Sequence, residues 1–156
     1  MANALYDNAK ASLKLGFISW LDDSFAVALV NTGLDYGYQV LPSDIRLSDI
    51  PRSAIVATAP LENTAIIDGA ASADDVCFKY VTSSIKGEVV SAMVIYKDTG
   101  DVETSTLVAY IDTVFGSFPL VPNGGDITIS WGIGPNKIFF IGHDGLDTIT
   151  KSEVIQ

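Results

Sequence analysis

Residues 89–111, VVSAMVIYKDTGDVETSTLVAYI, decide the fold. The stretch 89–96 is apolar at nearly every position, which is typical of a strand buried on both faces, so we expect it at the centre of the sheet structure. A polar turn around Gly100 follows, and residues 107–111 form a second apolar run. The pattern therefore predicts a β-hairpin over residues 89–111.

Further short strands are predicted on both sides of this hairpin. In residues 126–131, Ile127, Ile129 and Trp131 alternate with polar residues, which predicts one buried and one solvated face. A tight connection then leads to residues 137–141, which predicts a second hairpin. The remaining predicted strands are residues 25–30, 54–58, 64–67 and 76–80.

One helix is predicted, at residues 3–15. Asn3 can cap its first turn and Gly16 can end it. Leu5, Ala9 and Leu13 form one apolar stripe, which would face the core or a neighbouring subunit. Together, this helix and the strands predict a mainly β protein: an antiparallel β sandwich or barrel-like domain with one N-terminal α-helix.

The length of 156 residues suits one domain, which we assign to residues 1–141. Residues 142–156 are polar without a clear period and are interpreted as a C-terminal tail or arm. The long connection at residues 31–53 carries Tyr36 and Tyr38, and exposed tyrosines suit protein interfaces.

The charge composition bears on the class of partner. Nine Lys and Arg residues stand against nineteen Asp and Glu residues, which gives a net charge of −10. Nucleic-acid binding requires a concentrated basic face, and anionic membranes attract basic segments, so neither is an expected partner. The N-terminus lacks the pattern of a signal peptide, and no apolar run has the length of a membrane span. We therefore expect synthesis in a cytoplasm.

Few residues offer catalytic or metal-binding chemistry. Cys77 lies in a predicted strand and is expected to pack as a small apolar residue, far in sequence from the single histidine, His143. Asp144 and Asp147 could give His143 at most a weak oxygen site, and a surface turn is the simpler interpretation. We therefore predict no catalytic residue, no cofactor and no metal site.

Two acidic segments and four aromatic residues could each form a functional site, but each also has a simpler structural explanation. Asp98, Asp101 and Glu103 share a turn that could offer oxygen ligands to calcium, but a solvated hairpin tip explains them more simply. The neighbouring carboxylates Asp22 and Asp23 are interpreted as a solvated turn. A sugar platform could be built from aromatic residues, although Trp131 is expected in the core; its candidate members are Trp20, Trp131, Tyr36 and Tyr38.

Several segments carry a resemblance to a known family. They are AMVIYKDTG at 92–100, STLVAYID at 105–112, LVPNGGDITISW at 120–131, NKIF at 136–139 and the start MANALYD, with Trp20 and the strand near 27–30. Together they resemble a family of small virion structural proteins of tailed bacteriophages, found in the head region, some of which are capsid decoration, or cement, proteins. The resemblance covers residues 1 to about 140 and supplies no catalytic residues.

The resemblance implies a non-enzymatic virion protein that binds the outer surface of the major capsid protein lattice and stabilises the head. It also implies a homo-oligomer, with a trimer favoured. We expect contacts through the N-terminal segment, the 31–53 connection and the tail, at Leu5, Tyr6, Tyr36, Tyr38, Ile149 and Val154. An alternative is a head–tail connector, tail or fibre component, a class that includes glycan-binding modules; a third is a small enzyme that uses carboxylates.

Overall fold

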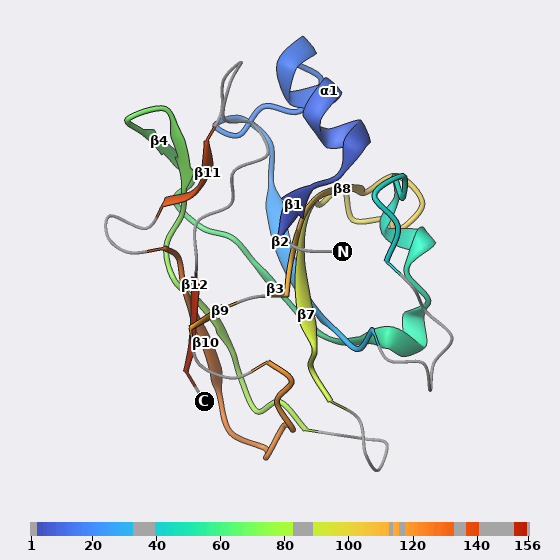
Figure 1. Cartoon of the computed structure of the whole chain (residues 1–156), viewed down its shortest axis with the longest axis vertical. Helices are drawn as coiled ribbons and strands as arrows, with labels where there is room; N and C mark the ends of the chain where they lie inside the picture. The colour runs from blue at the N-terminus through green and yellow to red at the C-terminus, as the bar shows by residue number, and fades with distance from the viewer. Residues whose placement is uncertain are drawn as a thin grey trace.

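The computed structural model describes residues 3–32, 40–82, 89–112, 114–115, 118–132, 137–140 and 152–155. In these ranges the chain forms three sheets and one α-helix (Figure 1), which confirms a mainly β, sandwich-like fold with an N-terminal helix. Pairing is antiparallel except between β12 and β9, and no sheet in these ranges closes into a barrel.

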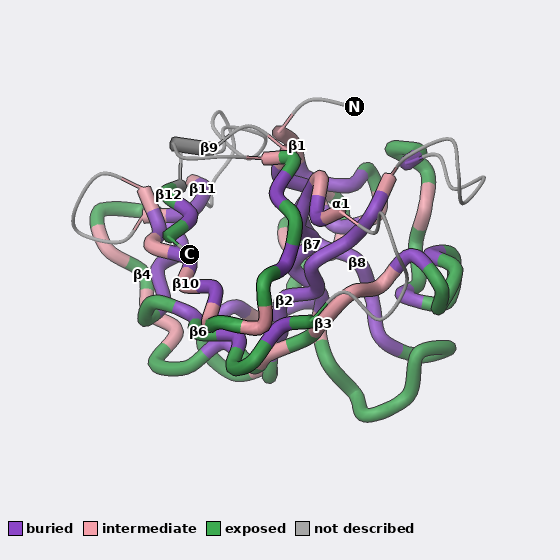
Figure 2. Tube along the Cα trace, turned by 90° about the horizontal axis from the view of Figure 1, so that it is seen from below, coloured by how far each residue is buried: buried purple, intermediate pink, exposed green. Residues whose placement is uncertain are grey.

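The first sheet contains the predicted 89–111 hairpin. In spatial order its strands are β1 (Ala4–Leu5), β8 (Thr106–Ile111), β7 (Ala92–Lys97), β2 (Phe25–Val30) and β3 (Ile55–Pro60). β7 lies at the centre, as predicted. Every residue of β2 and β8 is buried, and so is every residue of β7 except the last, Lys97 (Figure 2). Apolar side chains on both faces of these strands therefore form the core of the protein.

Two smaller sheets complete the fold. The second sheet has the order β6 (Val76–Phe78), β10 (Ile127–Ser130), β12 (Ser152–Ile155) and β9 (Val114–Phe115). The third sheet has the order β11 (Lys137–Phe140), β5 (Ala70–Ser72) and β4 (Ala65–Ile67). The short strand β5 was not among the predicted strands, because its sequence Ala-Ala-Ser lacks the β-branched and aromatic residues that mark the equally short β4 and β6.

The predicted second hairpin, between residues 126–131 and 137–141, is wrong. Both strands form, but β10 pairs with β6 and β12, whereas β11 pairs with β5. Ile127 and Ile129 are buried and Thr128 and Ser130 are not, as their alternation predicted. That alternation defines which face is buried but not which strand lies alongside, because any neighbour of matching polarity satisfies it.

The interpretation of residues 142–156 as a tail is wrong for residues 152–155, and so is the domain end at residue 141. Those residues form β12, which lies inside the second sheet between β10 and β9. Val154 pairs with Ile129 and is 8% exposed. A four-residue strand flanked by polar residues carries too little periodicity to be distinguished from a tail.

The helix α1 (Asp7–Leu15) is shorter than the predicted 3–15 segment. Its C-terminal end is confirmed, since Gly16 has a φ of 82°, a left-handed conformation that glycine adopts without strain. The predicted cap is wrong: Asn3 Oδ1 accepts a hydrogen bond from the distant Asp112 N (2.8 Å), and Tyr6 occupies the N-cap position. Residues 4–5 instead form β1 against β8.

Both tryptophans are buried, Trp20 contacts two sheets, and the core position expected for Trp131 is confirmed. Trp20, 2% exposed, packs against Phe25 of the first sheet and Phe139 of the third, with ring centroids 4.5 Å and 5.2 Å away. Trp20 Nε1 donates to Ser72 O (3.0 Å) and Trp131 Nε1 donates to Asp74 O (3.0 Å). Each indole thus buries its ring while its N–H group stays hydrogen-bonded.

Candidate interaction site

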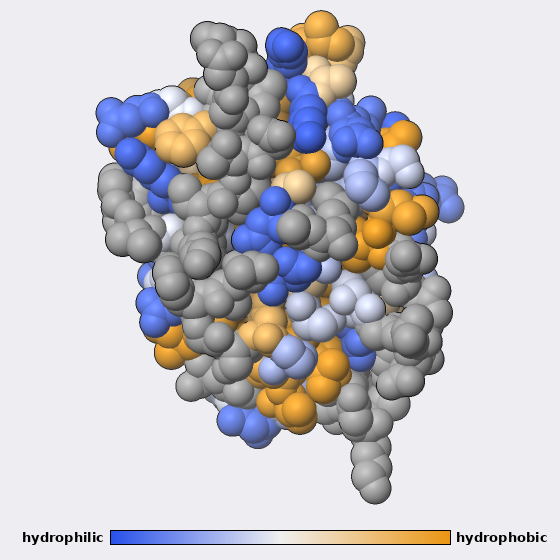
Figure 3. All heavy atoms as spheres, viewed as in Figure 1, coloured by the Kyte–Doolittle hydropathy of each residue, from blue (hydrophilic) through white to orange (hydrophobic). Residues whose placement is uncertain are grey.

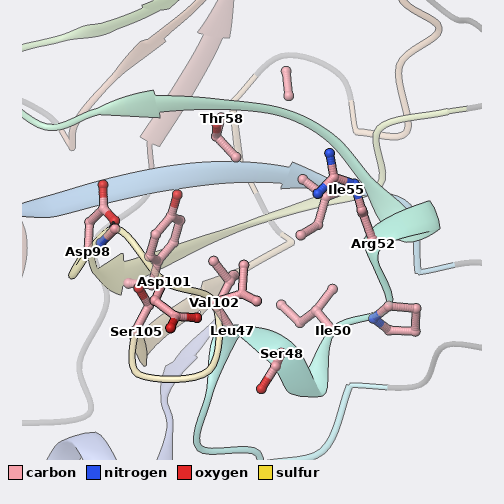
Figure 4. A pocket seen from close by; sticks show the side chains of 14 residues that line it. Leu47, Ser48, Ile50, Arg52, Ile55, Thr58, Asp98, Asp101, Val102 and Ser105 are labelled. Atoms are coloured by element: carbon pink, nitrogen blue, oxygen red, sulfur yellow. Dashed lines mark hydrogen bonds between the residues drawn. The ribbon is translucent and has the colours of Figure 1, made fainter.

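A pocket of about 540 Å³ opens beside the first sheet (Figure 4). One wall comes from two 3-10 turns, η2 (Leu47–Asp49) and η3 (Arg52–Ala54), and from the start of β3. The other wall is the turn at residues 98–105, which joins β7 to β8. Apolar side chains lie between the walls, and polar groups surround them.

Hydrogen bonds within the chain define the shape of the 98–105 turn. Asp98 Oδ1 accepts from Gly100 N (2.9 Å), and Asp101 Oδ1 accepts from Glu103 N (2.9 Å). Gly100 has a φ of 86°, which a residue with a side chain adopts only with strain. Asp98, Asp101 and Glu103 are exposed, as a solvated hairpin tip requires.

Backbone hydrogen bonds tie the two walls of the pocket together. Leu47 N donates to Ser105 O (2.9 Å), and Ser48 N donates to Val102 O (3.0 Å). The Asp49 carboxylate accepts from Arg46 N (2.9 Å) and Ile45 N (2.8 Å), and these bonds lower the pKa of Asp49. The pocket is therefore a feature of an ordered backbone rather than a gap between loose loops.

Tyr96 brings a phenol to the acidic side of the pocket. Its side chain is 5% exposed and hydrogen-bonds with Thr58. Burial raises the pKa of Tyr96, and the negative charge of Asp98 raises it further. Tyr96 therefore stays a neutral hydrogen-bonding group at physiological pH.

The charges around the pocket are segregated. Figure 4 shows Asp98 and Asp101 toward one end and Arg52 toward the other, with Leu47 and Ile50 between them. In the described part of the chain, no Lys or Arg forms an ion pair with Asp98 or Asp101. One end of the pocket therefore carries two carboxylates without a cationic partner among those residues.

The structure corrects the predicted interface residues. Leu5 (1% exposed) and Tyr6 (0%) are buried in the core, because β1 pairs with β8 and α1 packs on it. Val154 is buried by its place in β12. Three of the six predicted contact residues are therefore unavailable to a partner. The other three lie outside the described residues: Tyr36, Tyr38 and Ile149.

The core position predicted for Cys77 is wrong. Val76 and Phe78 are 3% and 2% exposed, whereas Cys77 between them faces outward and is exposed. The strict alternation of β6 places these two neighbours on the buried face, which leaves the cysteine on the other. Val76, Cys77 and Phe78 are all apolar, so the pattern alone did not show which face is buried.

The remaining candidate catalytic and metal-binding residues do not form a site among the residues that the structure describes. Asp22 is exposed in a turn, and Asp23 forms an ion pair with Lys97 (3.2 Å). No group of three or more His, Cys, Asp or Glu residues able to hold a metal ion is present among the residues that the structure describes. His143, Asp144 and Asp147 lie outside them.

Sequence reasoning missed an exposed apolar group at the end of α1, which we call the 15–21 patch. Its members are Leu15, Phe17 and Leu21, which are 69%, 72% and 57% exposed. Figure 3 shows apolar side chains at the surface at this end of the helix. Leu15 and Phe17 lie outside the Leu5, Ala9, Leu13 stripe, and this departure from the helical period was the available signal.

The described helices include none that is long and apolar enough to cross a membrane. Comparison with known proteins found no match: no family model, no curated protein and no solved structure matches this chain.

Proposed function

We propose that this chain is a non-enzymatic virion protein of a tailed bacteriophage, which decorates the capsid exterior and stabilises the head. The virion role follows from the sequence resemblance, and the structural observation that carries binding to another protein is the 15–21 patch, which exposes three large apolar side chains within seven residues. Apolar groups concentrated in this way are typical of surfaces that bind other proteins.

The 15–21 patch is held on an ordered scaffold. Asp23 Oδ2 accepts from Ser19 N (2.8 Å), and Asp23 N donates to Ser19 O (2.9 Å). Lys97 Nζ, at the end of β7, lies 3.2 Å from Asp23 Oδ2 and 3.4 Å from Phe17 O. These bonds anchor the patch to the first sheet, so a partner would meet a preorganised surface with little entropy to lose.

Attachment to a symmetric lattice suits a small protein with a limited contact surface. A trimer placed at lattice threefold positions would repeat the same contact three times, and multivalent contacts raise net binding without a larger interface in each copy. The net charge of −10 favours the outer surface of the shell, away from packaged DNA.

The test is saturation binding to mature capsids prepared from a phage strain that lacks the gene for this chain. Purified protein is co-sedimented with the capsids, and band ratios give the number of copies bound. We expect copies comparable to the number of coat subunits or of lattice threefolds. Light scattering of the free protein tests the trimer separately.

A variant pair locates the contact. Phe17→Ser with Leu21→Ser should weaken capsid binding at least tenfold, whereas Val121→Ser, which replaces a 60% exposed apolar residue elsewhere, should leave it within twofold. Binding of only a few copies per particle would favour a connector, tail or fibre role instead. Absence of binding would reject the proposed function.

A further inference from the structure

The pocket beside the 98–105 turn combines apolar walls with two carboxylates at one end, and this combination specifies a ligand. We propose that the pocket binds a lysine or arginine side chain presented by a partner protein. This proposal does not depend on the virion role, because it concerns which side chain the pocket binds rather than which protein presents that side chain.

The apolar lining suits the aliphatic part of such a side chain. Leu47 and Ile50 are 5% and 3% exposed, so they form a closed floor, and Val102 stands at the rim, 48% exposed. The methylene groups of lysine and arginine pack on apolar surface of this kind while their charged ends stay at a polar edge.

The carboxylates suit the charged end. Each uses one oxygen to accept a backbone N–H group, so the second oxygen of Asp98 and of Asp101 remains for a cation. Neither has an ion-pair partner among the described residues, and the buried phenol of Tyr96 beside them is an additional polar group. Arg52 lies toward the opposite end, where it would repel a second cation and so favours one orientation.

The surroundings favour a protein over a small free cation. Besides Val102, the segment that leads into η2 exposes Ile45 (40%) and Leu41 (47%), and Ile45 O accepts from Leu107 N (2.9 Å) next to the turn. A protein that inserted one basic side chain would also cover these apolar groups, whereas a small free cation would leave them in water.

The experiment uses NMR titration of the full chain, observed at the methyl groups of Leu47, Ile50 and Val102. The probes are the capped peptides acetyl-Ala-Arg-Ala-amide and acetyl-Ala-Lys-Ala-amide. The control is the same peptide with citrulline, which keeps the shape of arginine without its charge. We expect saturable shifts with at least one basic peptide, and at least fivefold weaker binding of the citrulline peptide.

A pair of double variants distinguishes binding at the pocket from the general electrostatic attraction of basic peptides to an acidic protein. Asp98→Asn with Asp101→Asn keeps the oxygen that each turn N–H group needs and should weaken binding at least tenfold. Asp68→Asn with Glu153→Gln removes the same charge from exposed positions in other sheets and should leave binding within threefold. Equal binding of the citrulline peptide, equal loss in both variants, or shifts confined to other residues would overturn the proposal.

Discussion

The first sheet contains one strand pair joined by a short turn, whereas every strand pair of the second sheet joins segments that are distant in the chain. β7 and β8 follow one another through the 98–105 turn, so their pairing is local. β10 instead pairs with Val76–Phe78 on one side and Ser152–Ile155 on the other. Closing long loops has an entropic cost that the β7–β8 pair avoids, and the first sheet adds distant pairs such as β1 with β8 to this local hairpin.

The largest effect is expected in the first sheet. Ile95→Ala in β7, where Ile95 is 0% exposed, should lower the free energy of unfolding by about 4 kcal/mol, because a cavity forms at the centre of the core. Chemical denaturation measures it. Ile66→Ala, at a 44% exposed position in β4, is the control and should lose less than about 1 kcal/mol. Similar losses at both positions would contradict the central role of β7.

A smaller effect is expected when β12 is removed. Deleting residues 152–156 exposes β10 along one edge and removes buried Val154, which should lower the free energy of unfolding by about 3 kcal/mol. Hydrogen exchange should accelerate at β10 amides and remain slow at β7 amides. If β7 amides lost protection equally, the two sheets would be a single cooperative unit.

Alkaline pH should weaken the first sheet through Tyr110 of β8. Burial and the charge of Asp112 raise the pKa of Tyr110 to about 12, above its value in the unfolded chain. Below the pKa of the unfolded chain, the tyrosine is protonated in both states and the protein keeps its full stability. As the pH rises from there toward the folded-state pKa, the unfolded chain loses the proton more readily than the folded chain, so the free energy of unfolding falls. We expect a loss of about 1 kcal/mol between about pH 9 and about pH 11.

Tyr110→Phe tests this assignment, because phenylalanine keeps the ring without a titrating group. Denaturation curves recorded at both pH values should differ less for this variant than for the unchanged protein. An equal pH dependence in the two proteins would assign the effect to other groups.

The smallest effect concerns ion pairs at the margins of the two sheets. Lys97→Met removes the pair with Asp23, whose side chains are 28% and 22% exposed, and should cost about 0.5 kcal/mol at low salt. Lys79→Met removes the more exposed pair with Asp126 near the second sheet and should cost less. Thermal denaturation with and without added salt measures both. A larger loss for Lys79→Met would reverse the expected order.

The sequence predicted the positions of most strands, but beyond the β7–β8 hairpin it did not predict which strands pair with one another. Residues 25–30 and 89–111 carry long apolar runs, and such runs predict buried strands whatever their neighbours are. β5 was missed because Ala-Ala-Ser carries no β-branched or aromatic residue, and β12 was missed because its two apolar residues stand among polar ones. Leu5 was assigned to a helix, although pairing with Ala109 in β8 makes it part of a strand.

The pocket could not have been found in the same way. Asp98 and Asp101 were recognised as an acidic turn, but their apolar counterparts, Leu47 and Ile50, come from a connection some fifty residues earlier. Nothing in either segment indicates that backbone bonds such as Ser48 N to Val102 O will bring them together.

The sequence by itself determined the mainly β class, the central hairpin and the helix stop at Gly16, because apolar periodicity and glycine conformation act over a few residues. Only the tertiary structure decided that the C-terminal segment enters a sheet, that Leu5, Tyr6 and Val154 are buried, and that Cys77 is exposed. Those outcomes depend on which distant segments pair, and strand pairing is chosen by the whole core rather than by any local pattern.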